Sequence, residues 1–387
     1  MSTPGLEPGL VFGETQMISV RSLSFVAVLG LASAGYSQIA LSAMTSFSGD
    51  GWLSPADYAS YGTDDSRGMS LNVTTGNVYV CKNAEIRIIN GTTGADLGTL
   101  NGTGISGGTR ARNKVSVTAD GQIFVCNLTT NSTTSPFKIY RYANELAAPE
   151  LVFSGAAAGA AGIRLGDSFD ADGVASSVDL IGGYGVGAGT LAAFSNGIAR
   201  LQQVAPSGFT ASSLLYTSAA AGAFRLGVAH TDANNFIGSA GGAINATRRQ
   251  SFTDTSVSTP VTLTTNAERA SDFLSLGGFE FLATIDSAGT TVGSSGNTVR
   301  VYQSTGSTAT LIQSINLTSG ILPNANASSD IRFGTFTGVV SGGYDGVLYA
   351  LNTNNGIQAF NVHVVPEPTS MIALGLGAAA LLRRRKK

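Results

Sequence analysis

Three aspartates in one short segment are a candidate metal site. They lie in Asp167-Ser-Phe-Asp170-Ala-Asp172-Gly173. Carboxylate oxygens are the ligands that Ca²⁺ prefers, so Asp167, Asp170 and Asp172 are weak calcium candidates. The segment lacks the ligand spacing of an EF-hand loop and its closing Glu. A solvated turn is the alternative, and we expect no cofactor unless calcium binds here.

Histidine and cysteine are too scarce for most catalytic and metal centres. The 387 residues include two His, His230 and His363, and two Cys. Catalytic triads, zinc sites and thiolate clusters each need one or more of these residues placed together. The two histidines are far apart in sequence, so we expect each to be an isolated strand or loop residue. No catalytic constellation is found, and the sequence predicts a protein that is not an enzyme.

The two cysteines occupy matching positions in two similar segments. Cys81 ends Asn-Val-Tyr-Val-Cys and Cys126 ends Gln-Ile-Phe-Val-Cys. A disulfide is permitted in an exported protein. Equivalent strands of neighbouring repeats can still hold their Cα atoms too far apart for a bond. We favour two buried thiols over a disulfide.

Other chemical motifs are weak. Gly102-Thr-Gly104-Ile-Ser-Gly107 matches G-x-G-x-x-G, but it does not join a strand to a helix, so no dinucleotide site is expected. Trp52, the single Trp, could stack on a sugar or pack against the strand that closes the fold. Charged residues make up 12% of the chain, the net charge is -2, and the basic residues have no surplus outside the C-terminal tail. Nucleic-acid binding is therefore not expected.

The body of the chain, from about residue 41 to 365, repeats a unit of four short strands. The first two units open at Arg67 and Lys114, and each has a tight turn, at Gly76 or Asp120-Gly121. Apolar and polar residues alternate with a period of two, as in β-strands. Four further openings lie near Ile163, Phe224, Ala270 and Asp330. This period predicts an all-β fold, a β-propeller of six or seven blades.

The two ends of the repeat complement each other. The last unit lacks a fourth strand, whereas an unassigned strand, Leu41–Phe47, precedes the first unit. We predict that this N-terminal strand becomes the outermost strand of the last blade and closes the ring, which leaves no unpaired end blade.

An export signal precedes the repeat. Arg21, an apolar core from Leu23 to Leu31, and Ala32-Ser-Ala34 form the three parts of a secretory signal peptide. We predict cleavage after Ala34, with Ala32 and Ala34 as the recognised small residues. Residues 1–34 are the predicted leader and signal peptide, with Met17 as the expected start; the alternative is that residues 1–16 belong to a longer n-region. Export machinery is the implied partner.

A three-part tail follows the repeat at residues 365–387. The box is Val365, Pro366, Glu367 and Pro368, and the apolar run is Met371–Leu382. The basic end includes Arg383, Arg384 and Arg385. The prolines favour an extended, exposed backbone. The apolar run of about 12 residues is shorter than the roughly 20 that a full span requires. An ordinary tail anchor is the alternative interpretation.

This tail resembles the PEP-CTERM sorting signal of Gram-negative bacteria. The resemblance implies a short transmembrane helix, transient passage through the inner membrane and cleavage by an exosortase-type membrane protease. It also implies a cell-surface or secreted location and an association with exopolysaccharide and biofilm. The propeller, residues 35–364, is expected to be a non-catalytic binding or structural domain for extracellular polysaccharide. The alternatives are a propeller hydrolase or lyase and a calcium-dependent adhesin.

Overall fold

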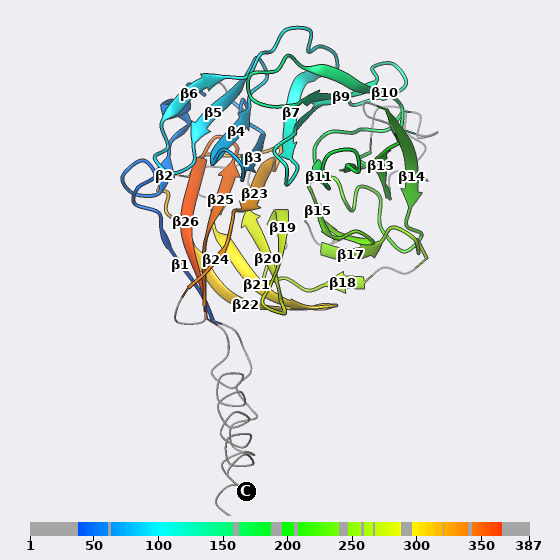
Figure 1. The fold of residues 1–387 in the computed structure, drawn as a ribbon. Coiled ribbons are helices and arrows are strands. Elements are labelled where there is room, and N and C mark those ends of the chain that lie inside the picture. The colour runs from blue at the N-terminus through cyan, green and yellow to red at the C-terminus, as the bar shows by residue number, and fades with distance from the viewer. Residues whose placement is uncertain are drawn as a thin grey trace, which may run out of the picture. The chain divides into compact units, whose positions relative to one another are not determined.

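The computed structural model describes residues 38–60, 63–157, 162–186, 196–204, 208–239, 247–256, 259–265, 268–287, 296–319, 321–339 and 343–365. Its strands form six antiparallel sheets arranged as the blades of a ring (Figure 1). The prediction of a β-propeller is confirmed, and the number of blades is six. The predicted sorting helix lies outside the described residues. Within them, no helix has both the length and the hydrophobicity to span a bilayer.

The first three blades follow one another along the chain. Blade one consists of β3 (Gly68–Asn72), β4 (Asn77–Cys81), β5 (Ile86–Asn90) and β6 (Asp96–Thr99). Blade two consists of β7 (Arg110–Val117), β8 (Ile123–Leu128), β9 (Phe137–Tyr142) and β10 (Glu150–Gly155). Blade three consists of β11 (Asp170–Asp172), β12 (Asp179–Gly183), β13 (Gly197–Gln203) and β14 (Phe209–Leu215).

The next two blades repeat this order. Blade four consists of β15 (Gly227–Asp232), β16 (Asn235–Ser239), β17 (Thr247–Ser251) and β18 (Thr259–Val261). Blade five consists of β19 (Glu268–Leu276), β20 (Phe279–Asp286), β21 (Val299–Thr305) and β22 (Thr308–Ile315). The first strand of each blade lies innermost, next to the first strands of the neighbouring blades.

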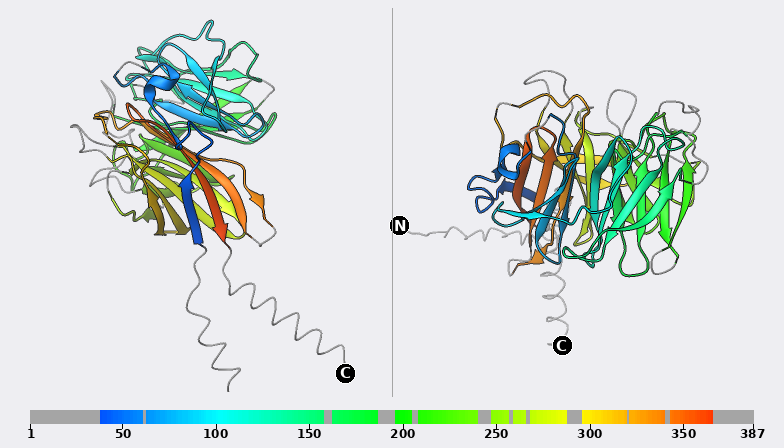
Figure 2. Two further views of the ribbon diagram at one scale, coloured as in Figure 1. Left: turned by 90° about the vertical axis from the view of Figure 1, so that its left-hand side faces the viewer. Right: turned by 90° about the horizontal axis from the view of Figure 1, so that it is seen from above.

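Blade six takes its outermost strand from the other end of the chain. It consists of β23 (Ser329–Phe333), β25 (Tyr344–Asn352), β26 (Gly356–Val365) and β1 (Gln38–Ala43). Two short strands extend it: β2 (Trp52–Leu53) pairs with β26, and β24 (Thr337–Gly338) pairs with β25. The predicted closure of the ring is confirmed, since β1 runs antiparallel beside β26 (Figure 2).

The bounds of the closing strand differ from the prediction. We expected Leu41–Phe47, but β1 begins at Gln38 and ends at Ala43, and Phe47 donates its amide to the Met44 carbonyl in a turn. The last strand is also longer than expected. Val365, predicted to belong to the sorting box, is the last residue of β26 and pairs with Gln38.

The turns between the first two strands of blades one and two form as predicted. Gly76 and Gly121 have φ of 74° and 89°. This left-handed region is open to glycine at little steric cost, so the chain can reverse within a few residues.

The core lies between the blades. Among the described residues, each pair of neighbouring blades encloses a cluster of buried apolar side chains. This arrangement follows from the period of two along each strand, which gives every sheet two faces, each covered by an adjacent blade. Ile39 and Leu41 of β1 belong to the cluster between blades five and six. The closing strand therefore contributes to the core as well as to the sheet.

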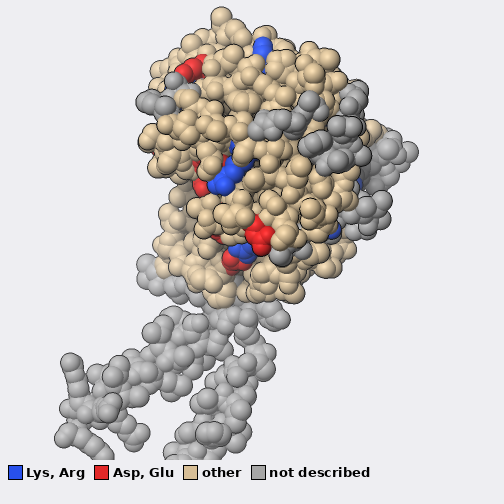
Figure 3. Space-filling model, turned by 90° about the vertical axis from the view of Figure 1, so that its right-hand side faces the viewer, with Lys and Arg blue, Asp and Glu red and all other residues tan. Residues whose placement is uncertain are grey.

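The surface is poor in charge. In the view of Figure 3 most side chains are uncharged, and the basic side chains near the middle of the face lie beside acidic ones. This agrees with the 12% of charged residues in the sequence.

Candidate functional site

Charged side chains gather in the central channel, where the innermost strands meet. A cavity of about 350 Å³ is lined there by residues of all six blades. Its ionisable side chains include Asp170, His230, Asp272 and Arg332, which come from blades three, four, five and six.

Arg332 and Asp170 cross this channel. Arg332 Nη1 of blade six lies 2.6 Å from Asp170 Oδ1 of blade three and 3.6 Å from Asp272 Oδ1. The other Asp170 oxygen accepts hydrogen bonds from the backbone amide of His230 at 2.9 Å and lies 2.8 Å from its Nδ1. One carboxylate therefore joins three blades.

The environment of each acid sets its protonation. Burial opposes ionisation of Asp170, but the Arg332 guanidinium and His230 outweigh it and hold the pKa of Asp170 below its usual range. Burial raises the pKa of Asp272 to about 6, despite the attraction of Arg332. Burial alone would lower the pKa of His230, but its hydrogen bond to Asp170 raises it. The bond between Asp170 and His230 therefore favours the ionised carboxylate and the protonated imidazole.

A second ion pair lies deeper among the innermost strands. Lys114 of blade two has a side chain that is 2% exposed, and its Nζ donates to the Ser329 carbonyl at 2.6 Å. Asp330 Oδ2 lies 3.4 Å from the same nitrogen. Buried charges persist only when they are paired and hydrogen-bonded. The ion pairs Arg332–Asp170 and Lys114–Asp330 therefore link different blades. Each carboxylate described so far, Asp170, Asp272 and Asp330, has a cationic neighbour.

The three calcium candidates lie in different surroundings. Asp170 is bound as described above. Asp167 accepts hydrogen bonds from Arg164 Nη2 at 2.9 Å and Arg225 Nε at 2.8 Å. Asp172 ends β11 and lines the channel cavity. The described residues contain no group of three or more His, Cys, Asp or Glu placed to hold a metal ion.

Asp167 lies beside a group of four arginines, which we call the arginine cluster: Arg67, Arg110, Arg164 and Arg225. Arg110 begins the innermost strand of its blade, and the other three arginines lie one to six residues before theirs. The four therefore gather on the face of the ring where the innermost strands begin. Burial and the neighbouring Arg164 and Arg225 lower the pKa of Arg67, although Asp64 and Asp167 oppose this. Burial and Arg67 likewise lower the pKa of Arg110.

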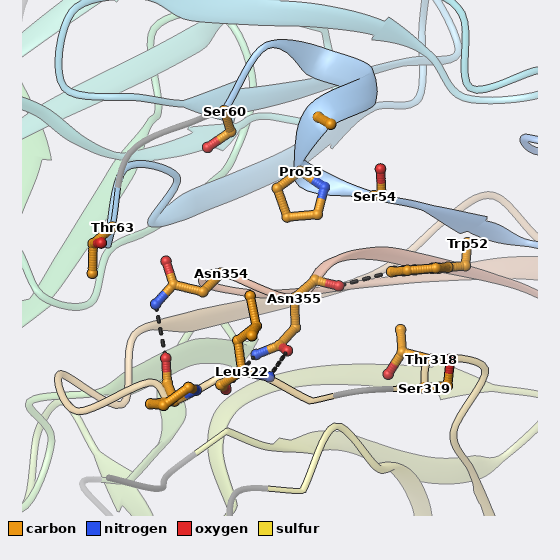
Figure 4. Close-up of a pocket in the computed structure, with 12 residues that line it drawn as sticks. Trp52, Ser54, Pro55, Ser60, Thr63, Thr318, Ser319, Leu322, Asn354 and Asn355 are labelled. Carbon is orange, nitrogen blue, oxygen red and sulfur yellow. Dashed lines mark hydrogen bonds between the residues drawn. The ribbon is translucent and has the colours of Figure 1, made fainter. Parts of the chain in front are cut away.

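A groove opens on the same face. Its volume is about 690 Å³, and it runs between the segment around the short 3-10 helix Pro55–Tyr58, the β25–β26 turn, and the segment before β23 (Figure 4). It is lined by Trp52, Ser54, Pro55, Ala56, Ser60, Thr63, Thr318, Ser319, Leu322, Pro323, Asn354 and Asn355. This volume falls within the range of roughly 300–1,000 Å³ typical of small-molecule sites.

Asp64 connects the groove to the arginine cluster. Its backbone amide donates to Asn354 Oδ1 at 2.7 Å, and Asn354 Nδ2 donates to Asp64 Oδ1 at 3.1 Å. Arg67 Nε donates to the Asp64 carbonyl at 3.2 Å. A neutral groove and a basic cluster are thus neighbours on one surface.

Trp52 lies both in the last blade and at the edge of the groove. It lies in β2, which pairs with the last strand, and its indole Nε1 donates to the Asn355 carbonyl at 2.9 Å. Its partly buried ring also lines the groove. The sequence could not reveal that Trp52 lines a groove, because the lining residues come from segments about 300 positions apart.

Both cysteines are free and buried, as we favoured. Burial raises the pKa of Cys81 to about 12 and raises that of Cys126 well above its usual value. His363, at the end of β26, is 44% exposed and lies 2.5 Å from Asp345. His363 lies in a different blade from His230, but His230 is not the isolated residue that the sequence predicted, since it is bonded to Asp170 in the channel.

The predicted export and sorting residues lie outside the described residues, apart from Val365. This applies to Ala32 and Ala34 and to Pro366, Glu367, Pro368, Arg383, Arg384 and Arg385.

Comparison with known proteins identifies the tail. Residues 364–386 match the family model of the PEP-CTERM protein-sorting motif. This motif is the recognition signal of exosortases, so it implies export, an exosortase as processing partner, and a surface or secreted protein. The resemblance seen in the sequence is confirmed. No curated protein matches the chain.

Solved structures match the propeller. A DUF4623 family protein from Bacteroides eggerthii DSM 20697 aligns with a TM-score of 0.61 at 16% identity, over 81% of this chain and 73% of that one. At this identity the match shows a shared fold. The polysaccharide lyase Uly1 aligns with a TM-score of 0.36 at 10% identity over 78% of each chain, a similarity too low to support an argument.

Proposed function

We propose that this protein is a non-catalytic surface or extracellular protein whose propeller binds extracellular polysaccharide. The observation that carries the proposal is the PEP-CTERM motif at residues 364–386, which follows directly on the last strand of a closed ring. Export and sorting bring such a ring to the polysaccharide outside the cell, and a role in the biofilm follows from that location.

The groups in the channel support binding over catalysis. A general acid or base must reach the proton that it transfers. Asp170 and Asp330 are each held by a cation of another blade, so neither carboxylate is free to transfer a proton. These groups stabilise the ring and leave binding to its surface.

The proposed maturation has two cuts. Residues 1–34 are the leader, with Met17 as the start and cleavage after Ala34, and residues 35–364 form the mature ring. Exosortase cleaves near the box Val365–Pro368, and the basic end with Arg383 stays behind in the inner membrane.

Two measurements test the proposal. Mass spectrometry of the protein recovered from the cell surface should find a C-terminus that lacks residues 383–387. The same protein should be retarded in a gel that contains polysaccharide extracted from the producing cells, with no change in the size distribution of that polysaccharide. A surface protein with an intact Arg383–Lys387 end, or depolymerisation of the glycan, would contradict the proposal.

A further inference from the structure

We propose that the Trp52 groove binds an uncharged sugar segment of that polysaccharide. This deepens the proposed function and rests on it, because it names the subsite and the chemical class of the ligand. Three features of the groove carry the inference: its lack of charge, its fixed aromatic ring, and its polar rim.

The first feature is the charge of the lining. None of the twelve lining residues is ionisable, although the arginine cluster lies close by. A site for a carboxylate, phosphate or sulfate would offer Arg or Lys at the ligand, and a site for a cation would offer carboxylates. The described lining of the groove offers neither Arg or Lys nor carboxylates, so it favours a neutral ligand.

The second feature is a ring that is held in place. The Nε1 of Trp52 is already hydrogen-bonded to the Asn355 carbonyl, so the indole cannot rotate without losing that bond. In Figure 4 the ring is seen edge-on, between a wall that carries Ser54 and Pro55 and a wall that carries Thr318 and Ser319. A flat apolar ring presents a suitable surface to the C–H face of a pyranose, and a fixed ring loses little entropy on binding.

The walls are also fixed before binding. Asn355 Nδ2 donates to the Leu322 carbonyl at 3.1 Å and its Oδ1 accepts from the Leu322 amide at 2.7 Å. Asn354 Nδ2 donates to the Pro323 carbonyl at 2.8 Å. These bonds join the β25–β26 turn to the segment before β23. The groove is therefore preformed, as small-molecule sites usually are.

The third feature is a rim of hydroxyl groups. Thr63 and Ser319 are exposed and bring two hydroxyl groups to the lining. Thr318 Oγ1 accepts from Asn297 Nδ2 and donates to Asn316 Oδ1, both at 2.9 Å, and it keeps one acceptor site. Hydroxyls that can both donate and accept suit sugar hydroxyls, which do the same.

The single Trp of the protein makes the test direct, because its fluorescence reports on this groove alone. The polysaccharide extracted from the producing cells is separated on an anion exchanger into a neutral and an acidic fraction. Each fraction is titrated into the mature exported protein while Trp emission and gel retardation are recorded. We expect the neutral fraction to shift the emission and to retard the protein.

Two variants change the groove in different ways. Trp52→Ala removes the ring and should weaken binding of the neutral fraction at least about tenfold, as truncation of an aromatic anchor does. Ser319→Phe fills the groove from its exposed wall and leaves the Trp52 bond intact, so it should weaken binding without loss of stability. Thr310→Phe, on the exposed edge strand β22, is the matched control and should bind as the unmodified protein does.

The outcomes separate the two proposals. Retardation by the acidic fraction alone, or by the neutral fraction with unchanged Trp emission, would refute the groove as the site while the polysaccharide-binding function stands. Binding by Ser319→Phe that equals that of Thr310→Phe would do the same. Absence of retardation by both fractions would refute the proposed function, and the groove inference with it.

Discussion

Closure of the ring by β1 can be tested by removing two apolar side chains. Ile39 and Leu41 are 4% and 7% exposed and pack in the cluster between blades five and six, whereas Ala40 between them faces solvent. Truncation of a buried Ile or Leu to Ala costs roughly 2–5 kcal/mol. We take the lower limit for each, about 4 kcal/mol together, because an outer strand relaxes more easily and neighbouring sites do not add fully.

The expected shift in melting temperature follows from the size of the ring. An unfolding entropy of about 2.1 cal/mol/K per residue gives about 0.7 kcal/mol/K for the roughly 330 residues from Gln38 to Val365. The double variant Ile39→Ala, Leu41→Ala should therefore melt about 6 °C lower. Circular dichroism with temperature measures this, and Ala40→Ser is the control. If the double variant had the same melting temperature as Ala40→Ser, the packing of β1 would not contribute to closure of the ring.

Three further predictions concern the charged channel and the thiols. Lys114→Met leaves Asp330 buried without its closest cation and should lower the free energy of unfolding in urea by about 3 kcal/mol. An unchanged urea midpoint would show that the Lys114–Asp330 ion pair does not stabilise the ring. The folded-state pKa of Asp272, about 6, lies above the ordinary value, so its contribution stabilises the fold at low pH and is lost as the pH rises through 6. Asp272→Asn should therefore raise the urea midpoint more at pH 7.5 than at pH 4, and an equal effect at both would disprove the raised pKa. Cys81 and Cys126 should resist a thiol reagent at pH 7.5 until urea unfolds the chain, and rapid labelling of the folded protein would contradict their burial.

The repeat could be predicted from sequence because each blade carries its own local pattern. The six predicted openings lie within the six innermost strands or up to seven residues before them: Arg67, Lys114, Ile163, Phe224, Ala270 and Asp330. The third is the least regular. Its strand β11 has three residues and begins seven positions after the expected opening, because Leu165 first forms an isolated bridge with Thr129 of blade two. A local pattern cannot reveal such a contact between blades.

The candidate site was harder to predict for a related reason. The channel residues Asp170, His230, Asp272 and Arg332 lie on the innermost strands of four blades. Asp272 and Arg332 both lie two positions after their openings, which is a signal in the sequence, but Asp170 and His230 lie seven and six positions after theirs and would not have aligned with them. The Trp52 groove leaves no comparable signal. Its walls come from segments outside the repeat pattern, so their meeting depends on ring closure.

The direction of the last strand relates the groove to the point of attachment. β26 begins at Gly356, directly after Asn355 of the groove, and ends at Val365. At about 3.3 Å per residue its ten residues carry the chain roughly 30 Å, from one face of the ring to the other. The sorting motif starts at residue 364, within the last two residues of this strand, at the face opposite the groove and the arginine cluster. β1 begins beside that same end, since Gln38 pairs with Val365 (Figure 2). Gln38 and Val365 thus lie together at one face of the ring, whereas the groove and the arginine cluster lie at the other.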